Sequence, residues 1–410
     1  MTKIVVTGLG AFSPLGTNAT DSWNAVLDGE SGARSLKYEW VEKYQIPVTF
    51  AATVPAPTSD FLERQEIKRL DPSSQFALIA AREAFADAGS PEVVPERLGV
   101  DWATGIGGVW TLLDAWDTLR EKGPRRVLPM TVPMLMPNGP AAAIEMSLGA
   151  RAFARTVVSA CASSTESIAN AYEHLTSGLA DIVIAGGSEA AVHPLPMASF
   201  AAMQALSKRN DDPAAASRPY DSGRDGFVLG EGAAAIVLET EEHAKARGAK
   251  IYAYLVGGAV TSDSYHITAP DPEGSAAARA MKAAVENAGF ALSDVAHVNA
   301  HATSTPVGDV AEVKALRRIF GDHLDSIPVT ATKSATGHLL GGAGAIEAIF
   351  TVKALQERVI PPTINLDAQD PEVTLDVVTE PRKLPEGDLL AISNSFGFGG
   401  HNAVVAFQSA

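Results

Sequence analysis

The segment Thr156-Val-Val-Ser-Ala-Cys161-Ala-Ser-Ser-Thr-Glu-Ser-Ile-Ala-Asn-Ala-Tyr172 contains the single cysteine of this 410-residue chain. Its first residues are β-branched, which predicts the end of a short strand. From Ser163 onward, apolar and small residues recur at steps of three and four, as one face of a helix requires. Ser163 and Ser164 are residue types that cap helix N-termini. The sequence therefore predicts a thiol at a strand-to-helix turn, within an α/β arrangement.

The position of Cys161 favours a nucleophile. Unpaired backbone N–H groups and the helix dipole at a helix N-terminus stabilise negative charge. We therefore expect the pKa of this thiol to lie below its ordinary value of about 8.5. The alternative is a buried structural cysteine, which is the commoner role of a lone cysteine. The nucleophile is favoured because two later segments supply histidines on similar turns.

The composition excludes several classes of protein. The chain has 32 Lys and Arg against 48 Asp and Glu, a formal charge of −16. This acidic balance argues against nucleic-acid binding, because no excess of cations exists to displace phosphate counterions. One cysteine excludes an internal disulfide and fits a reducing cytoplasm. Because no apolar run resembles a signal peptide or reaches eighteen residues, we expect a cytoplasmic protein without a membrane span.

Strand-like and helix-like segments alternate along the chain, and the pattern restarts near residue 250. We predict two α/β halves, 1–250 and 251–410, related by an old duplication and packed into one compact unit. The first half contains predicted strands at 98–103, 181–185 and 233–239 and a helix at 71–88. The second contains strands at 251–256, 295–299, 327–332, 389–393 and 403–407 and helices at 275–289, 309–320 and 341–355.

The glycines after the first apolar strand raise the alternative of a dinucleotide-binding loop. The segment is Gly8-Leu-Gly10-Ala-Phe-Ser13-Pro14, so serine replaces the third glycine of that fingerprint and proline follows at once. A structural glycine turn is the better interpretation. We predict no cofactor.

His301 and His338 each follow an apolar strand, at the edge where α/β sheets place ligand sites. One histidine alone is more often a hydrogen-bonded structural group, but two of them together with Cys161 form a less ordinary set. A metal site is not predicted. His297 and His301 are four residues apart, but their segment is a predicted strand, and no Glu follows the first histidine as a zinc-binding helix requires.

Four segments together resemble the signature segments of the beta-ketoacyl-acyl carrier protein synthases. They are Val158-Ser-Ala-Cys161-Ala-Ser, Asn299-Ala-His301-Ala-Thr-Ser-Thr-Pro-Val-Gly-Asp309, Thr332-Lys333-Ser-Ala-Thr-Gly-His338-Leu-Leu-Gly and Asn394-Ser-Phe-Gly-Phe-Gly-Gly-His-Asn402. The resemblance spans nearly the whole chain and is strongest to the type II elongating synthases of fatty-acid synthesis, particularly those of actinobacteria. It implies a thiolase-like fold, with two duplicated halves in a five-layer α-β-α-β-α arrangement, and a homodimer.

The resemblance also implies a catalytic sequence. Cys161 would take an acyl group from acyl carrier protein as a thioester. Malonyl-acyl carrier protein would then lose CO2, and His301 and His338, as neutral imidazoles, would donate N–H groups to the enolate oxygen. The carbanion would attack the thioester, with the backbone N–H groups of Cys161 and Phe398 holding the oxyanion. Lys333 would be a supporting charge near His338. The product would be a 3-oxoacyl-acyl carrier protein extended by two carbons.

The resemblance suggests further contacts with the substrate. Those for the pantetheine arm and the acyl chain would be Thr303, Thr305, Thr268, Ile106 and Gly399 beside the gating Phe398. Ordinary turn capping is the alternative for the threonines, and a tight hairpin is the alternative for the glycines around Phe398. Because carrier proteins are acidic and this chain is acidic too, docking needs a local basic patch. The candidates are Arg64, Lys68, Arg69, Arg125 and Arg126, although isolated basic residues are usually just solvated.

Rival functions differ in what they require of the sequence. A thiolase resolves its chemistry with a second cysteine, which this chain lacks. A noncatalytic chain-length partner subunit usually lacks the nucleophile, and a cysteine hydrolase needs neither two histidines nor a carrier patch. A ketosynthase of polyketide assembly shares the chemistry and stays open. The sequence also leaves open the acyl chain length and whether a cation lies near Asn299, Glu347 and Asn394.

Overall fold

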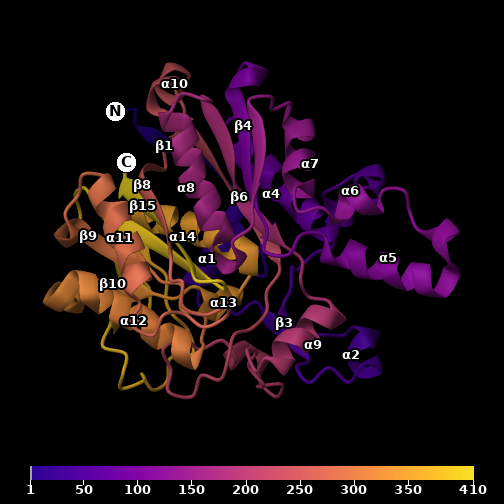
Figure 1. Ribbon diagram of the computed structural model, residues 1–410. Coiled ribbons are helices and arrows are strands. Elements are labelled where there is room, and N and C mark those ends of the chain that lie inside the picture. Colours follow the sequence, from indigo (N-terminus) through magenta and orange to yellow (C-terminus); the bar gives the residue numbers. More distant parts are fainter. Residues whose placement is uncertain (1) are drawn as a thin grey trace.

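The computed structural model describes residues 2–410, and its centre is an eleven-stranded mixed sheet (Figure 1). The order across the sheet is β12-β10-β9-β14-β15-β8-β1-β7-β6-β4-β5. The strands are β1 (Ile4–Phe12), β4 (Leu98–Ala103), β5 (Phe153–Val157), β6 (Ile182–Glu189), β7 (Gly232–Thr240), β8 (Ala253–Ser262), β9 (Val295–Asn299), β10 (Pro328–Thr330), β12 (Asp376–Val377), β14 (Leu390–Gly397) and β15 (His401–Ser409).

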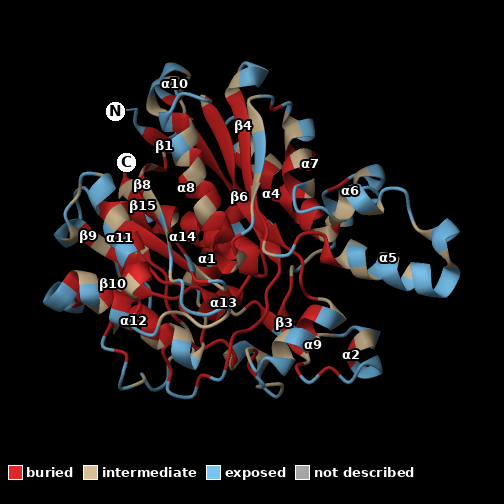
Figure 2. Cartoon of the chain, viewed as in Figure 1, coloured by how far each residue is buried: buried red, intermediate tan, exposed pale blue. Residues whose placement is uncertain are grey.

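Helices form three layers around these strands, which gives the expected five-layer order. The central pair is α8 (Ser163–Thr176) and α14 (Ala343–Glu357), and each contacts strands from both halves of the chain. On the outer face of the N-terminal strands lie α4 (Pro72–Asp87) and α7 (Gly139–Leu148). On the outer face of the C-terminal strands lie α11 (Ser275–Asn287) and α12 (Pro306–Phe320). Most of the sheet and of the central helices is buried, whereas the edge strand β5 and the last residues of β8 are partly exposed (Figure 2).

The strands of the two halves are joined edge to edge. β1 pairs antiparallel with β7 and, through its first residues, with β8, where Ile4 lies opposite Leu255. Because β1 pairs on both sides, the two halves share one continuous hydrogen-bonded ladder. The predicted boundary near residue 250 falls between α10 (Glu241–Ala246) and β8, and the division into two domains at that point stays a prediction.

The predicted glycine turn after the first strand is wrong, because Gly8 and Gly10 lie inside β1. A Cβ on Gly8 would lie 2.1 Å from the carbonyl oxygen of Ala84, and one on Gly10 would lie 2.1 Å from that of Ala80. The absence of side chains at these positions therefore lets α4 pack directly against the backbone of β1.

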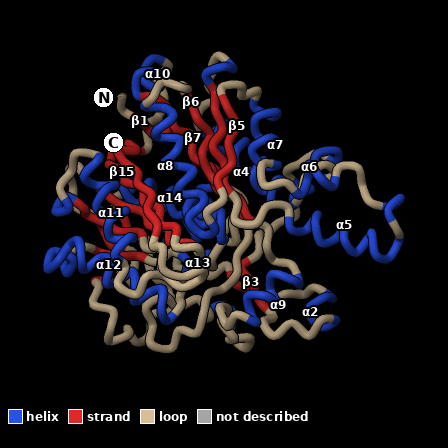
Figure 3. Tube along the Cα trace, in the orientation of Figure 1, coloured by secondary structure: helices blue, strands red, loops and turns tan. Residues whose placement is uncertain are grey.

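The remaining helices and strands connect or flank these elements, as the trace in Figure 3 shows. They are α1 (Ala19–Leu27), β2 (Ala33–Ser35), α2 (Glu39–Lys43), β3 (Phe50–Ala52), α3 (Arg64–Ile67), α5 (Val109–Lys122), α6 (Thr131–Leu135), α9 (Pro194–Ala202), α13 (Lys333–Thr336), β11 (Val359–Ile360) and β13 (Arg382–Lys383). The segment 109–137, with α5 and α6, projects from the body as an arm (Figure 1). None of the helices within residues 2–410 is long and apolar enough to cross a membrane.

Candidate active site

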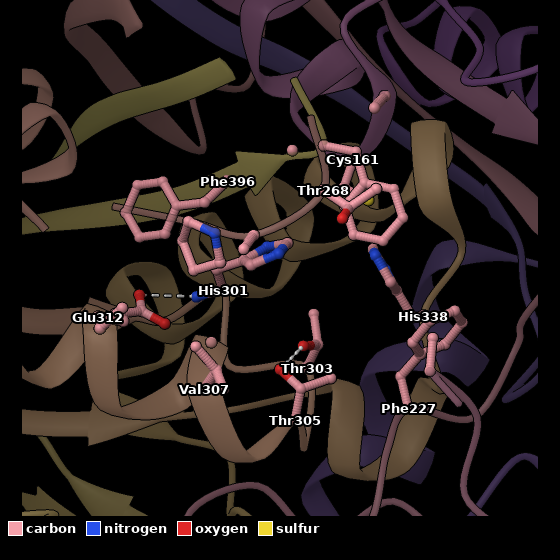
Figure 4. Close-up of a pocket in the computed structure, with 18 of the residues that line it drawn as sticks. Cys161, Phe227, Thr268, His301, Thr303, Thr305, Val307, Glu312, His338 and Phe396 are labelled. Atoms are coloured by element: carbon pink, nitrogen blue, oxygen red, sulfur yellow. Dashed lines mark hydrogen bonds between the residues drawn. The ribbon is translucent and has the colours of Figure 1, made fainter. Parts of the chain in front are cut away.

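Cys161, His301 and His338 line one cavity of about 560 Å³. They come from three segments: the turn before α8, the loop after β9, and the loop after α13. Figure 4 shows the side chains directed into the same space. The structure therefore brings together the thiol and the two imidazoles that the sequence singled out.

Cys161 lies in a 3₁₀ turn, Ala160–Ala162, directly before α8. The predicted serine caps are wrong, because Ser163 is already the first helical residue and the N-cap position is Ala162. Instead the Ser163 hydroxyl accepts from the N–H of Ser159 at 2.9 Å and donates to the carbonyl of Ala160 at 2.6 Å. Ala160 has a φ of +52°, a conformation that costs energy for any residue with a side chain. The hydroxyl thus fixes a strained turn that presents the thiol to the cavity.

The expected lowering of the thiol pKa is also wrong. Burial raises the pKa of Cys161 to about 11, because removal from water disfavours the thiolate. The Lys333 ammonium and the backbone N–H of Phe398 oppose this effect, and the negative charge of Glu189 reinforces it. The sulfur is therefore a thiol rather than a thiolate at neutral pH.

Hydrogen bonds from their backbone N–H groups hold His301 and His338 in place, so the imidazole rings are not needed for anchoring. The N–H of His301 donates to Glu312 at 2.9 Å, and the N–H of His338 donates to the carbonyl of Val228 at 2.8 Å. The centroids of the two rings are 5.5 Å apart, and the rings lie edge to face. His301 Nδ1 and both ring nitrogens of His338 are buried and have no hydrogen-bond partner within residues 2–410. Burial and the charge of Lys333 hold the pKa of both histidines well below the ordinary 6.5, so both rings are neutral.

Lys333 lies behind the cavity wall rather than on it. The side chains of Lys333 and Glu347 are each 1% exposed, and the Lys333 ammonium donates to the Glu347 carboxylate at 2.5 Å. Burial raises the pKa of Glu347, and Lys333 opposes that shift. The second carboxylate oxygen of Glu347 and the side-chain oxygens of Asn299 and Asn394 are buried without partners in the described chain. Lys333 therefore acts on His301 and His338 through its positive charge, which lowers their pKa, and not by direct contact with the cavity.

Most of the predicted substrate contacts lie on the cavity. They are Ile106, Thr268, Thr303, Thr305 and Phe398. The hydroxyls of Thr303 and Thr305 are 3.0 Å apart (Figure 4). Gly399 is not on the wall; its N–H donates to the carbonyl of Ile267, and it sits at the tip of the β14–β15 hairpin with a φ of +86°. Gly399 is therefore explained by the tight hairpin rather than by substrate contact, because its positive φ favours glycine.

Sequence reasoning missed Glu312, which organises the His301 side of the cavity. Its carboxylate accepts from the N–H groups of His301 and Ala302 and from the amide of Asn394 at 3.0 Å. The available signal was a carboxylate on the buried face of the predicted helix 309–320. Phe396, tilted against His301 at 5.7 Å, and Phe227, edge-on to His338 at 5.4 Å, were also missed. Phe396 lies in the signature segment 394–402, in which only Phe398 was given a role.

The five basic candidates for docking are all exposed, in two groups on different elements. Arg64 lies in α3, with Lys68 and Arg69 directly after it, whereas Arg125 and Arg126 lie in the turn that follows α5 in the projecting arm. Each group presents positive charge to solvent on an otherwise acidic chain. The two groups thus lie on separate elements of the chain.

Two family models match the chain. Residues 1–244 match the Beta-ketoacyl synthase, N-terminal domain, and residues 252–367 match the Beta-ketoacyl synthase, C-terminal domain. The chain belongs to the beta-ketoacyl synthase family. This confirms the resemblance inferred from the signature segments.

Relatives of this beta-ketoacyl synthase match over nearly its whole length. It is 46% identical over 406 residues to a 3-oxoacyl-[acyl-carrier-protein] synthase 2 of Mycobacterium tuberculosis, which covers 98% of this chain and 96% of the relative. It is 44% identical over 409 residues to the enzyme of the same name from Staphylococcus aureus, with 99% and 98% coverage.

Solved ketosynthase structures confirm the thiolase-like α/β fold. A beta-ketoacyl synthase from Burkholderia phymatum has a TM-score of 0.92 at 35% identity and covers both chains completely. The structure described as AntDE:AntF, a type II polyketide acyl-carrier protein in complex with its ketosynthase bound to the hexaketide, has a TM-score of 0.92 at 32% identity. It covers 100% of this chain and 99% of its own.

Within residues 2–410, no group of three or more His, Cys, Asp or Glu side chains is arranged to hold a metal ion. The cavity of this beta-ketoacyl synthase brings together a thiol and two neutral imidazoles.

Proposed function

We propose that the chain condenses an acyl thioester with malonyl-acyl carrier protein, releasing CO2 and giving a 3-oxoacyl-acyl carrier protein two carbons longer, in fatty-acid synthesis. The observation that carries the proposal is the convergence of Cys161, His301 and His338 on one cavity, where His301 Nδ1 and both ring nitrogens of His338 have no hydrogen-bond partner among residues 2–410. Relatives at 44–46% identity are named for this activity.

The first step is acyl transfer to Cys161. The sulfur attacks the carbonyl carbon of acyl-acyl carrier protein, the carrier thiolate leaves, and the proton of Cys161 passes to it. Because burial keeps Cys161 protonated, the proton leaves only as the carbon–sulfur bond forms. The backbone N–H groups of Cys161 and Phe398 stabilise the tetrahedral oxyanion, as oxyanion-hole donors do.

The second step is decarboxylation and condensation. Malonyl-acyl carrier protein loses CO2, and the electron pair of the broken bond forms an enolate of the acetyl thioester. His301 and His338 donate N–H groups to the enolate oxygen, a role that needs neutral rings. The enolate carbon attacks the carbonyl carbon of the Cys161 thioester, and sulfur leaves as a thiolate that takes up a proton. Thr303, Thr305 and Thr268 hold the pantetheine arm along the cavity, and Ile106 contacts the acyl chain.

Two features support an assembly with acyl carrier protein and with a second copy of the chain. The exposed arginines and lysine of α3 and of the arm suit an acidic carrier. β5 is the edge strand of the large sheet, and the arm exposes Leu112, Trp116 and Leu119. An unpaired sheet edge and exposed apolar side chains each suit a homodimer, because a partner would cover them.

The test is intact-protein mass spectrometry after incubation with acyl-carrier proteins of graded chain length. Wild-type protein should gain one acyl group, which peptide mapping assigns to Cys161, and should convert malonyl-acyl carrier protein to the 3-oxoacyl product. Cys161→Ala should lose acylation and condensation but retain malonyl decarboxylation. Condensation by Cys161→Ala would refute the assignment of the nucleophile. Acylation at another residue would do the same.

Polyketide assembly is the second candidate, because a solved structure with the same fold is a ketosynthase bound to a hexaketide. The two differ in what happens to the 3-oxo product. A fatty-acid enzyme adds one unit and stops until the ketone is reduced, whereas a polyketide enzyme extends unreduced chains repeatedly. Product analysis with excess malonyl-acyl carrier protein and no reductase distinguishes them.

A further inference from the structure

Glu189, the last residue of β6, joins segments that build the cavity although it is not on the cavity wall. Its carboxylate accepts from the N–H of Gly105 at 2.7 Å, the N–H of Gly341 at 3.1 Å and the hydroxyl of Thr104 at 3.1 Å. A longer contact of 3.3 Å comes from the N–H of Ile106. The side chain is fully buried. One carboxylate therefore holds the loop of the acyl pocket to the segment that follows His338.

Two glycines make room for this carboxylate. A Cβ on Gly105 would lie 2.6 Å from Glu189 Oε2, and a Cβ on Gly341 would lie 2.1 Å from the backbone nitrogen of Gly105. The position of the Gly105 Cβ is also 3.7 Å from the carbonyl oxygen of Ala160, in the turn that carries Cys161. We call Glu189, Gly105 and Gly341 the glutamate junction. It lies where the acyl-pocket loop, the nucleophile turn and the histidine segment meet.

The junction places a negative charge where it acts on the nucleophile. Burial raises the pKa of Glu189 to about 7, opposed by the N–H groups of Gly105 and Gly341, so the carboxylate is largely ionised at pH 8. Besides burial, the groups that act on the thiol are Lys333, the backbone N–H groups of Phe398 and Cys161 itself, and Glu189. Of these, only Glu189 reinforces burial in keeping the sulfur protonated.

We propose that Glu189 is a positioning residue, which holds the Ile106 wall of the acyl pocket in register with Cys161 and His338 and places a negative charge beside the turn that carries the thiol. The inference rests on the proposed function for its effect on condensation. Its effect on the thiol is independent of that function, because Cys161 is the only cysteine and reports its own reactivity.

The test is Glu189→Gln, measured for condensation and for the pH dependence of iodoacetamide alkylation. Glutamine keeps the shape but turns one acceptor oxygen into an N–H₂ donor that faces the donors of the junction. Condensation should fall about tenfold to a hundredfold, the cost of a displacement of about 1 Å in a catalytic array. The midpoint of the alkylation profile should move to lower pH, because a like charge that disfavoured the thiolate is gone.

Glu83→Gln is the matched control. Glu83 is another carboxylate that accepts from two backbone N–H groups, those of Ala11 and Ala19, and burial raises its pKa to about 7 as well. It is not on the active-site cavity. This control should change neither condensation nor the alkylation midpoint, so an effect confined to Glu189→Gln is not a general result of removing a carboxylate charge that accepts from backbone N–H groups.

Gly105→Ala separates the effect of the position of the Glu189 carboxylate from the effect of its charge. The new Cβ displaces the carboxylate without removing it, so condensation should fall while alkylation keeps its alkaline midpoint. The inference is overturned if both junction variants condense within about twofold of the Glu83→Gln control, or if Glu189→Gln leaves the alkylation midpoint unchanged. Should wild-type protein fail to condense at all, the proposed function fails, whereas the alkylation profile still tests the junction.

Discussion

Replacing Lys333 by methionine should destabilise the folded chain by about 3–5 kcal/mol, the typical cost of breaking a buried ion pair by removing one partner. Lys333 and Glu347 are each 1% exposed and lie 2.5 Å apart. The second oxygen of Glu347 has no partner in the described chain, so nothing else compensates its charge. Methionine keeps the length of the side chain and removes only the ammonium. The loss of stability therefore reports the cost of leaving the Glu347 charge unpaired rather than the cost of a cavity.

The assay is urea unfolding followed by tryptophan fluorescence, since Trp23 and Trp102 are fully buried. With a slope of about 3 kcal/mol per molar urea, the midpoint should fall by about 1 M or more. The matched control is the double variant Lys333→Met/Glu347→Leu, which removes both charges. It should recover most of the loss, because replacing a whole buried pair by apolar groups is often neutral or stabilising.

The loss of stability in Lys333→Met should depend on pH, because Glu347 titrates. Burial raises the pKa of Glu347 in the folded chain, whereas the unfolded value is about 4.3. Without Lys333 the folded pKa rises further, because the ionised form loses its partner. A carboxyl with a raised folded pKa costs no stability below the unfolded pKa and costs more as pH rises toward the folded one. The gap between wild type and Lys333→Met should therefore be wider at pH 8 than at pH 5.

Two results would refute this reasoning. If Lys333→Met unfolded at the same urea concentration as wild type at pH 8, the pair would not be a buried ion pair in solution. If the double variant were no more stable than the single one, the loss would come from packing of the lysine stem rather than from the stranded charge. A stability gap independent of pH would likewise exclude Glu347 as the group responsible.

Three further variants test the site directly. His338→Ala, made in the Cys161→Ala background, should lose malonyl decarboxylation measured as CO2 release, because the enolate oxygen loses a donor; unchanged release would remove His338 from the enolate site. Charge reversal at Arg125 and Arg126 should raise KM for carrier-bound substrate about tenfold or more and leave KM for a pantetheine analogue unchanged, since only the carrier meets the patch; an equal rise for both would count against docking there. Thr305→Val should raise KM about tenfold for both forms of substrate, consistent with one lost hydrogen bond of about 1 kcal/mol or somewhat more; an effect on the carrier-bound form alone would exclude the pantetheine arm as the contact.

Much of the fold was predictable because its signals are local. The predicted strands at 98–103 and 295–299 depend on a few neighbouring residues each, and the structure has both. The nucleophile and the two histidines were likewise identified from short segments around strand ends. Glycines were harder to interpret. Gly8 and Gly10 read as a turn, but they lie inside β1, because the reason for them is contact with α4, some 70 residues further along the chain.

The sequence by itself determined the alternation of strands and helices and the residue types able to form a thioester and bind an enolate oxygen. Only the tertiary structure decided that Cys161, His301 and His338 face one cavity, and that Glu312 and Glu189 hold its walls. It also reversed the expected pKa of the thiol. The physical reason is the range of each effect: a cap or a strand depends on adjacent residues, whereas desolvation sums over every group that the fold packs around the sulfur.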